Sequence, residues 1–232
     1  MSVVDEVIVL AGGLGTRLRP LVHDVPKPLA LVSGKPFLEW VLQGLADQGM
    51  RRCILATGYM ADKIQARLGP TFLDMEMVYS VEAEPLGTGG AIALAARHLS
   101  GTAAHVVNGD TFLRYSPHGL EQIAKRHNAI GIALARVDDV SRYGAVQLDG
   151  EHVRGFSEKG KTGGGWINAG CYFLDQSALD AMPDGKFSFE EHILQPYAAA
   201  GRVVAVTETS GFIDIGIPED YLRAQQRFGA GM

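Results

Sequence analysis

The sequence predicts an α/β fold with a mixed, mostly parallel central sheet flanked by helices. In the first half, short segments rich in β-branched residues alternate with helix-like segments, which is the pattern of βαβ units. Glycine-rich or acidic residues directly follow several of the apolar segments. Parallel sheets bind ligands beyond the carboxyl ends of their strands, so this placement also predicts where a ligand site lies.

The first half supplies the parallel core of this predicted sheet. The expected strands are "VIVLA" (7–11), "CILAT" (53–57), "MVYSV" (77–81) and "AAHVVNGD" (103–110). The expected helices between them cover residues 36–48, 61–68 and 89–99.

The second half has more strands and fewer helices, which predicts a mixed or antiparallel extension of the sheet. The expected strands cover residues 130–137, 144–149, 152–159, 166–174 and 202–208. Helices are expected over 188–201 and over 218–228, where Pro218 takes the first helical position.

Composition and length limit the class of protein. The 232 residues are expected to form a single domain, and a net charge of -5 argues against a nucleic-acid partner. No apolar run approaches the roughly 20 residues of a membrane helix, and the first residues do not resemble a signal peptide. We therefore expect a cytoplasmic protein with no membrane partner. Cys53 and Cys171 lie in apolar stretches and are expected to be reduced core thiols.

The stretch "LAGGLGTRLRP" follows the first predicted strand and is a candidate phosphate loop. Its glycines leave backbone N–H groups unshielded, and such groups can surround phosphate oxygens, although a purely structural tight turn is the alternative. Leu18 stands where the dinucleotide fingerprint needs a third glycine, and no P-loop lysine follows. Arg17 and Lys27 add positive charge. Pro28 favours an extended conformation at Lys27, which then offers its side chain from a stiff segment.

Asp110 and Asp214 are candidate metal ligands. Each follows or ends an apolar strand, so both carboxylates could meet at one edge of the sheet. Mg²⁺ prefers oxygen ligands and is commonly held by one or two carboxylates, water and substrate phosphates. The alternative is that each aspartate is a turn residue.

The chain resembles the sugar-1-phosphate nucleotidyltransferases, which make nucleotide sugars from a nucleoside triphosphate and a sugar 1-phosphate. The blocks that carry the resemblance run in the family's order along nearly the whole chain: "LAGGLGTRLRP", "PKPL", "GKPFLEW", "EPLGTGGAI", "VNGD", "RYGAV", "FSEKG", "NAGCYF" and "FIDIG". The forms "EAEPLGTGG" and "IDIGIPEDY" look most like guanylyltransferases acting on heptose or mannose-type 1-phosphates.

This resemblance implies a Rossmann-like nucleotidyltransferase fold over residues 1–232, with the nucleotide mainly on 1–115 and the sugar phosphate mainly on 116–232. It also implies GTP and a sugar 1-phosphate as partners, Mg²⁺ as cofactor, a homodimer, and a role in supplying precursors of bacterial surface polysaccharides.

The resemblance further implies residue roles. Asp110 and Asp214 would ligate Mg²⁺, and the catalytic set would be Arg17, Lys27 and Asp110. Nucleotide contacts would come from Leu10, Ala11, Gly12, Gly13, Gly15, Thr16, Arg17, Glu82, Pro85, Gly87, Thr88, Asn108 and Asp110. The sugar phosphate would contact Lys27, Gly144, Glu158, Lys159, Asn168 and Gly170.

Glu82 is the predicted reader of the base. It stands five positions before Gly87, where relatives that use uracil or thymine triphosphates commonly carry a glutamine. An ionised carboxylate only accepts hydrogen bonds, and guanine offers two adjacent donors at N1 and its amino group. Uracil and thymine would place a carbonyl against one of the oxygens, so this residue favours GTP. Glu84 could take the same role, and a solvated glutamate without a role is the alternative.

Other functions remain open on the sequence alone. The sugar could be mannose in place of heptose, and the nucleotide could be UTP or dTTP. The chain could also be a non-catalytic regulatory subunit that binds nucleotide sugars, although it retains Arg17, Lys27, Asp110, Lys159 and Asp214. A Rossmann-type oxidoreductase is disfavoured because the third fingerprint glycine is missing.

Overall fold

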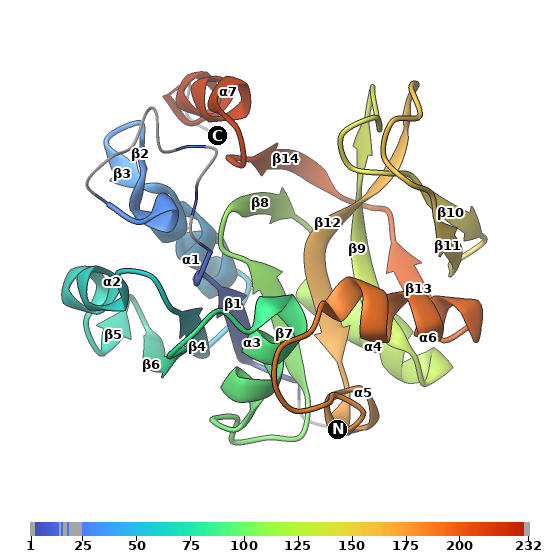
Figure 1. Cartoon of the computed structure of the whole chain (residues 1–232), viewed down its shortest axis with the longest axis horizontal. Helices are drawn as coiled ribbons and strands as arrows, with labels where there is room; N and C mark the ends of the chain where they lie inside the picture. The colour runs from blue at the N-terminus through green and yellow to red at the C-terminus, as the bar shows by residue number, and fades with distance from the viewer. Residues whose placement is uncertain (1–2, 14, 16–17, 19–24, 230–232) are drawn as a thin grey trace.

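A computed structural model describes residues 3–13, 15, 18 and 25–229. In these residues the main sheet has ten strands, ordered β10-β11-β13-β9-β12-β7-β1-β4-β6-β5. Figure 1 shows the sheet running through the molecule with helices around it. The mixed sheet flanked by helices confirms the fold class expected from the sequence.

The parallel part of the sheet comes from the first half of the chain. Its strands are β1 (Glu6–Leu10), β4 (Arg52–Thr57), β6 (Met75–Val81) and β7 (Ala104–Asn108), all close to the expected ranges. β1 pairs in parallel with β4 on one side and with β7 on the other, and β6 extends the β4 side. The chain therefore changes direction along the sheet between β6 and β7, which makes the end of β1 a switch point of the topology.

The antiparallel part comes from the second half, as expected. β12 (Gly165–Leu174) runs antiparallel to both β7 and β9 (Ile130–Val137). β13 (Val203–Val206) is parallel to β9, and the sheet ends in the hairpin-like pair β11 (His152–Phe156) and β10 (Val146–Asp149). At the opposite edge lies β5 (Thr71–Phe72).

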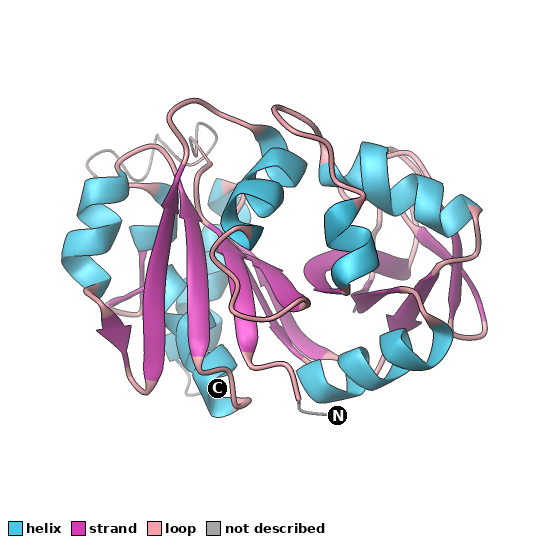
Figure 2. Ribbon diagram, turned by 90° about the horizontal axis from the view of Figure 1, so that it is seen from below, coloured by secondary structure: helices cyan, strands magenta, loops and turns pink. Residues whose placement is uncertain are grey.

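Two hydrophobic cores cover the two faces of the sheet, because successive residues of a buried strand point to opposite faces. Val7 and Val9 face the core that holds α1 (Phe37–Asp47), α2 (Ala61–Leu68), α4 (Pro117–His127) and α7 (Pro218–Gly229). Ile8 faces the core that holds α3 (Gly87–Ala96), α5 (Gln176–Asp180) and α6 (Gln195–Ala199). Figure 2 shows the strands between these helical layers.

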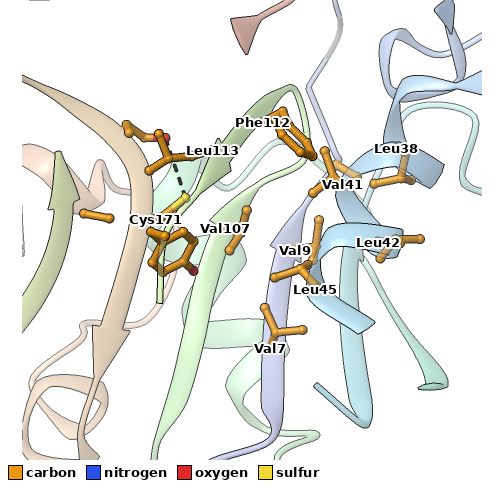
Figure 3. Packing of buried hydrophobic residues seen from close by; sticks show 14 of the residues in the cluster. Val7, Val9, Leu38, Val41, Leu42, Leu45, Val107, Phe112, Leu113 and Cys171 are labelled. Atoms are coloured by element: carbon orange, nitrogen blue, oxygen red, sulfur yellow. Dashed lines mark hydrogen bonds between the residues drawn. The ribbon is translucent and has the colours of Figure 1, made fainter. Parts of the chain in front are cut away.

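α1 shows how the first core is filled. Its side chains Val41 and Leu45 lie toward the valines of β1, and Leu38 and Leu42 are buried in the same core (Figure 3). α1 therefore supports β1, whose carboxyl end leads into the glycine-rich loop.

Several short elements, among them α5, β5 and β8 (Thr111–Arg114), were not expected from the sequence, and two longer segments also differ from the expectation. α4 was not expected, although Ser116 caps it by accepting from the Gly119 N–H at 3.0 Å and Pro117 opens it. The helix expected over 188–201 begins instead as a π-helical turn, η2 (Glu190–Leu194), followed by α6.

Two small sheets complete the fold. β8 (Thr111–Arg114) pairs with β14 (Ser210–Asp214), and β2 (Leu31–Val32) pairs with β3 (Lys35–Pro36). A 3-10 turn, η1 (Lys27–Leu29), precedes β2.

Both cysteines lie in the interior of the fold. Cys53 and Cys171 are free and buried, as expected, and burial raises the pKa of both thiols. None of the helices in the described ranges combines the length and the apolar character needed to cross a bilayer.

His105, on β7, is a buried titratable group in the core. Its side chain has no exposed surface, and neither ring nitrogen has a hydrogen-bond partner among the described residues. Burial lowers its pKa from 6.5 to about 4, while Glu121 on α4 raises the pKa and Lys125 and His118 lower it.

This histidine makes the stability of the fold depend on pH. In the unfolded chain it takes up a proton near pH 6.5, but in the folded protein only near pH 4, so the unfolded state binds more protons between these values. The free energy of unfolding should therefore fall as the pH drops from 7 to 4, by roughly 2 to 3 kcal/mol from this residue. Urea unfolding of wild type and of His105→Leu at each pH measures it. The stability difference between the proteins should change with pH; parallel curves would contradict the assignment.

Candidate active site

The candidate site is a cavity of about 420 Å³ beyond the carboxyl ends of β1, β4 and β7. This is the switch point of the sheet, where open α/β sheets commonly bind ligands. The residues that line it are Leu10, Ala11, Gly12, Gly13, Lys27, Pro28, Ala56, Glu82, Pro85, Gly87, Thr88, Ala91, Asn108 and Asp110. The structure therefore brings most of the expected nucleotide contacts to one cavity.

The glycine-rich loop forms one wall of this cavity. Among the described residues, the amides of Gly12 and Gly13 have no hydrogen-bond acceptor, so both donors are available to an anion. A Cβ atom at Gly12 would lie 2.6 Å from Glu82 Oε1, so a larger residue there would displace the Glu82 carboxylate. Gly15 adopts a positive φ of 58° beside Lys27. Thr16 and Arg17 lie outside the described residues.

Lys27 and Asp110 form an ion pair at the edge of the cavity. Lys27 Nζ lies 2.5 Å from Asp110 Oδ2, and the lysine side chain is only 12% exposed. The expected extended conformation at Lys27 is wrong, since this residue begins the 3-10 turn η1 and its carbonyl accepts from Ala30 N at 3.0 Å. Pro28 fits a first helical turn because residues there need no intrahelical N–H donor.

The pairing of β8 with β14 brings Asp110 and Asp214 together. Asp214 lies opposite Thr111, and the N–H of Ile215 donates to the Asp110 carbonyl at 3.0 Å. Burial and the charge of Asp110 raise the pKa of Asp214, while Lys27 and the Gly216 N–H lower it. The two carboxylates are thus close enough to repel each other, and one lysine offsets only part of their charge. A cation at this position would be stabilised by both.

Glu82 lies at the other end of the cavity, at the carboxyl end of β6. Its N–H donates to the Thr57 carbonyl at 2.8 Å, which fixes the backbone, and its Oε2 accepts from Leu86 N at 2.7 Å. The side chain therefore lies directly against Gly12 and also holds the loop that leads into α3. Glu84 is exposed and does not line the cavity.

The expected sugar residues lie outside this cavity, with the exception of Lys27, which lines it. Glu158 and Lys159 are exposed on the loop between β11 and β12. That loop is held to residues 140–141 by hydrogen bonds from Gly160 N to the Ser141 carbonyl and from Val140 N to the Gly163 carbonyl. These two bonds hold the middle of the loop and the part before β12.

Asn168 and the two expected sugar-site glycines are explained by local packing. Asn168 donates to the Tyr172 hydroxyl at 2.8 Å and accepts from Gly170 N at 2.9 Å. Gly144 and Gly170 have φ values of 81° and 71°, and a Cβ would collide with the Ser157 carbonyl at the first and with the Asn108 side chain at the second. Through the contact with Asn108, residues 168–170 pack against the wall of the nucleotide cavity.

Three cavity residues were not expected from the sequence: Pro28, Ala56 and Ala91. Pro28 follows Lys27 in the "PKPL" block, Ala56 lies near the carboxyl end of β4, and Ala91 is the fifth residue of α3. Of the three, only Ala56 lies near the end of a predicted strand, where a ligand site was expected. A small apolar side chain carries no chemical signature, so its role as lining emerges from the packing.

A larger cavity, of about 1080 Å³, lies at the amino-terminal ends of β1 and β4, beside Glu6 and Arg52. Glu6 accepts there from the Ser100 and Gly101 amides and pairs with Arg52 at 2.7 Å. These charged groups satisfy each other, so we assign this region a structural role.

Comparison with known proteins places the chain in a family. A family model described as Nucleotidyl transferase matches residues 6–230. D-glycero-alpha-D-manno-heptose 1-phosphate guanylyltransferase from Campylobacter jejuni is 39% identical over 218 residues, covering 93% of this chain and 96% of that protein. Mannose-1-phosphate guanylyltransferase from Mycobacterium tuberculosis is 36% identical over 228 residues, covering 94% of this chain and 63% of that protein.

A solved structure gives the same result. HddC from Yersinia pseudotuberculosis, complexed with GMP-PN, is 40% identical with a TM-score of 0.82, covering 97% of this chain and all of that chain. These similarities confirm the resemblance stated from the sequence blocks and rule out the oxidoreductase. With the cavity at the switch point and the free amides of its glycine-rich loop, they show that the chain belongs to the nucleotidyl transferase family.

Proposed function

We propose that this protein transfers GMP from GTP to a manno-heptose 1-phosphate and releases pyrophosphate. The observation that carries the proposal is one cavity lined by the Lys27–Asp110 pair, by Glu82, and by Gly12 and Gly13, whose amides have no acceptor among the described residues. These groups suit the parts of a purine nucleoside triphosphate: the carboxylate of Glu82 can bind the base, and the amides and Lys27 can bind the phosphates. The heptose assignment rests on the similarity to the Campylobacter protein, and the guanine assignment is supported by the Yersinia structure, which is a complex with GMP-PN.

In the proposed reaction an oxygen of the sugar 1-phosphate attacks the α-phosphorus of GTP. A phosphorus–oxygen bond forms there while the bond to the β-phosphate oxygen breaks, and pyrophosphate leaves with that bonding pair. Such transfers depend on positioning and on charge neutralisation, so the protein needs no nucleophilic side chain.

Each residue group has a proposed part in this transfer. The Gly12 and Gly13 amides hold the triphosphate, and Arg17 offsets charge on the departing pyrophosphate. Lys27 orients phosphates near the point of transfer, and Lys159 anchors the phosphate of the sugar. Residues 1–115 thus bind mainly the nucleotide and residues 116–232 mainly the sugar phosphate.

We propose that Asp110 and Asp214 hold Mg²⁺. The donor set fits, because two adjacent carboxylates with only partly offset charge are the oxygen ligands that Mg²⁺ prefers. When bound, the ion would neutralise phosphate charge during transfer. In the structure Lys27 pairs with Asp110 and offsets the charge of that carboxylate. With a cation on the two carboxylates, the lysine would be able to turn to a phosphate group instead.

We propose that the sugar lies on the second half of the chain. Glu158 can accept from sugar hydroxyls, and Asn168 is held in place by Tyr172 and Gly170 beside the nucleotide cavity. Gly144 and Gly170 shape the backbone there. Mannose 1-phosphate is the second candidate substrate, favoured by the similarity to the Mycobacterium protein.

We further propose that the protein acts in the cytoplasm as a homodimer and supplies precursors for surface polysaccharides. GTP is a cytoplasmic metabolite, which supports the location. The dimer and the pathway rest on the family resemblance.

The proposed activity can be tested by pyrophosphate release. With GTP and Mg²⁺, the protein should release pyrophosphate when a manno-heptose 1-phosphate is present, and less efficiently with mannose 1-phosphate or glucose 1-phosphate. Each sugar phosphate should be supplied as both anomers. Absence of pyrophosphate with every sugar, from protein that binds GTP, would favour the non-catalytic subunit; no GTP binding would contradict both.

Glu82 should determine the preference for GTP. Its contact with Leu86 N uses one of about four acceptor positions of the carboxylate, which leaves room for both guanine donors. Glu82→Gln should reduce the ratio of kcat/KM for GTP over UTP by roughly 5- to 150-fold, because one acceptor becomes a donor. Glu84→Gln is the matched variant at an exposed position. An unchanged ratio in Glu82→Gln with a reduced ratio in Glu84→Gln would transfer the role to Glu84.

A further inference from the structure

The loop that forms the base end of the cavity is held by a segment from the other half of the chain. This loop, Glu82–Thr88, contacts the segment Lys186–Glu190, about 100 residues later in the sequence. Phe187 N donates to the Leu86 carbonyl at 3.0 Å, and Gly89 N donates to the Phe187 carbonyl at 3.1 Å. In Figure 1 the orange segment after α5 runs beside α3 before it enters α6.

The glycines of "GTGG" make this close approach possible. A Cβ at Gly87 would lie 2.6 Å from the Phe187 carbonyl oxygen. At Gly89 it would collide with the Phe187 ring, and at Gly90 with the Gly185 carbonyl. A block that the sequence associates with nucleotide binding is therefore glycine-rich because the second half of the chain packs against it.

Thr88 is the side chain through which this contact reaches the cavity. Its hydroxyl donates to Glu190 Oε2 at 2.8 Å and accepts from Phe189 N at 2.9 Å. Ser188 donates to the same Glu190 oxygen at 3.2 Å. Since the Thr88 proton is used by Glu190, this hydroxyl does not donate to a nucleotide, although Thr88 lines the cavity.

We infer that Glu190 is a positioning residue for the nucleotide: it fixes Thr88, and through Thr88 the Glu82–Thr88 wall of the cavity. A hydroxyl bonded to a carboxylate is held more strongly than one bonded to a neutral acceptor, and Glu190 is half-buried, where such a bond is less screened. Glu190 does not line the nucleotide cavity, so it acts on the nucleotide through Thr88. The inference rests on the proposed function insofar as GTP is the ligand.

The experiment measures GTP binding by calorimetry, in Mg²⁺ and without sugar phosphate, for wild type, Glu190→Ala and Glu191→Ala. Glu191 is the adjacent, exposed glutamate, and its side chain does not contact Thr88. The Kd for GTP should rise roughly tenfold in Glu190→Ala and stay unchanged in Glu191→Ala. In steady-state assays the KM for GTP should rise in the same way, while the KM for the sugar phosphate changes little.

A merely structural role would give a different result. Loss of folded protein lowers the number of binding sites and the apparent kcat but leaves the Kd of the remaining sites unchanged. If Glu190→Ala does not fold, Glu190→Gln and Thr88→Val replace it, and the double variant should bind GTP no more weakly than the weaker single variant, because both act on one contact.

Two outcomes would overturn the inference and are distinct from each other. A wild-type Kd in folded Glu190→Ala, or additive losses in the double variant, would remove Glu190 from nucleotide positioning while the proposed function stands. Failure of wild type itself to bind GTP would contradict the proposed function and this inference together.

Discussion

The active-site geometry depends on the antiparallel pairing of β8 with β14. This short ladder brings Asp214, from the end of the chain, beside Asp110, which follows β7. The pairing collects negative charge at the switch point, and the ion pair with Lys27 offsets part of it. Without the ladder the two carboxylates would belong to separate loops, and the cavity would lack its proposed cation site.

A second constraint joins the two halves of the chain around the same cavity. Gly170 packs against Asn108, and Phe187 packs against the "GTGG" turn. Residues of the second half thus shape a cavity whose described lining residues all lie in the first half. This explains how the proposed sugar region and nucleotide region can be separate in sequence and yet be held in a fixed relation.

The sequence predicted the strands of the first half and the helices between them well. These strands are buried on both faces and the helices on one, which gives each its own pattern of apolar residues. The sequence-based prediction missed α4 despite the Ser116 cap and Pro117, since that helix has no expected strand directly before it. Lys27 lines the cavity, but its backbone conformation differs from the extended one that was expected. The neighbour effect of Pro28 was outweighed by the hydrogen bonds of a 3-10 turn.

We propose that Asp110 and Asp214 act as one cation site for phosphate transfer. The most direct measurement is turnover with GTP, sugar phosphate and saturating Mg²⁺ in Asp110→Asn, Asp214→Asn and the double variant. Each single variant should lose most of its turnover while remaining folded, and the double variant should be little worse, because residues that act as a unit are not additive. Turnover like that of wild type in either single variant would contradict the claim.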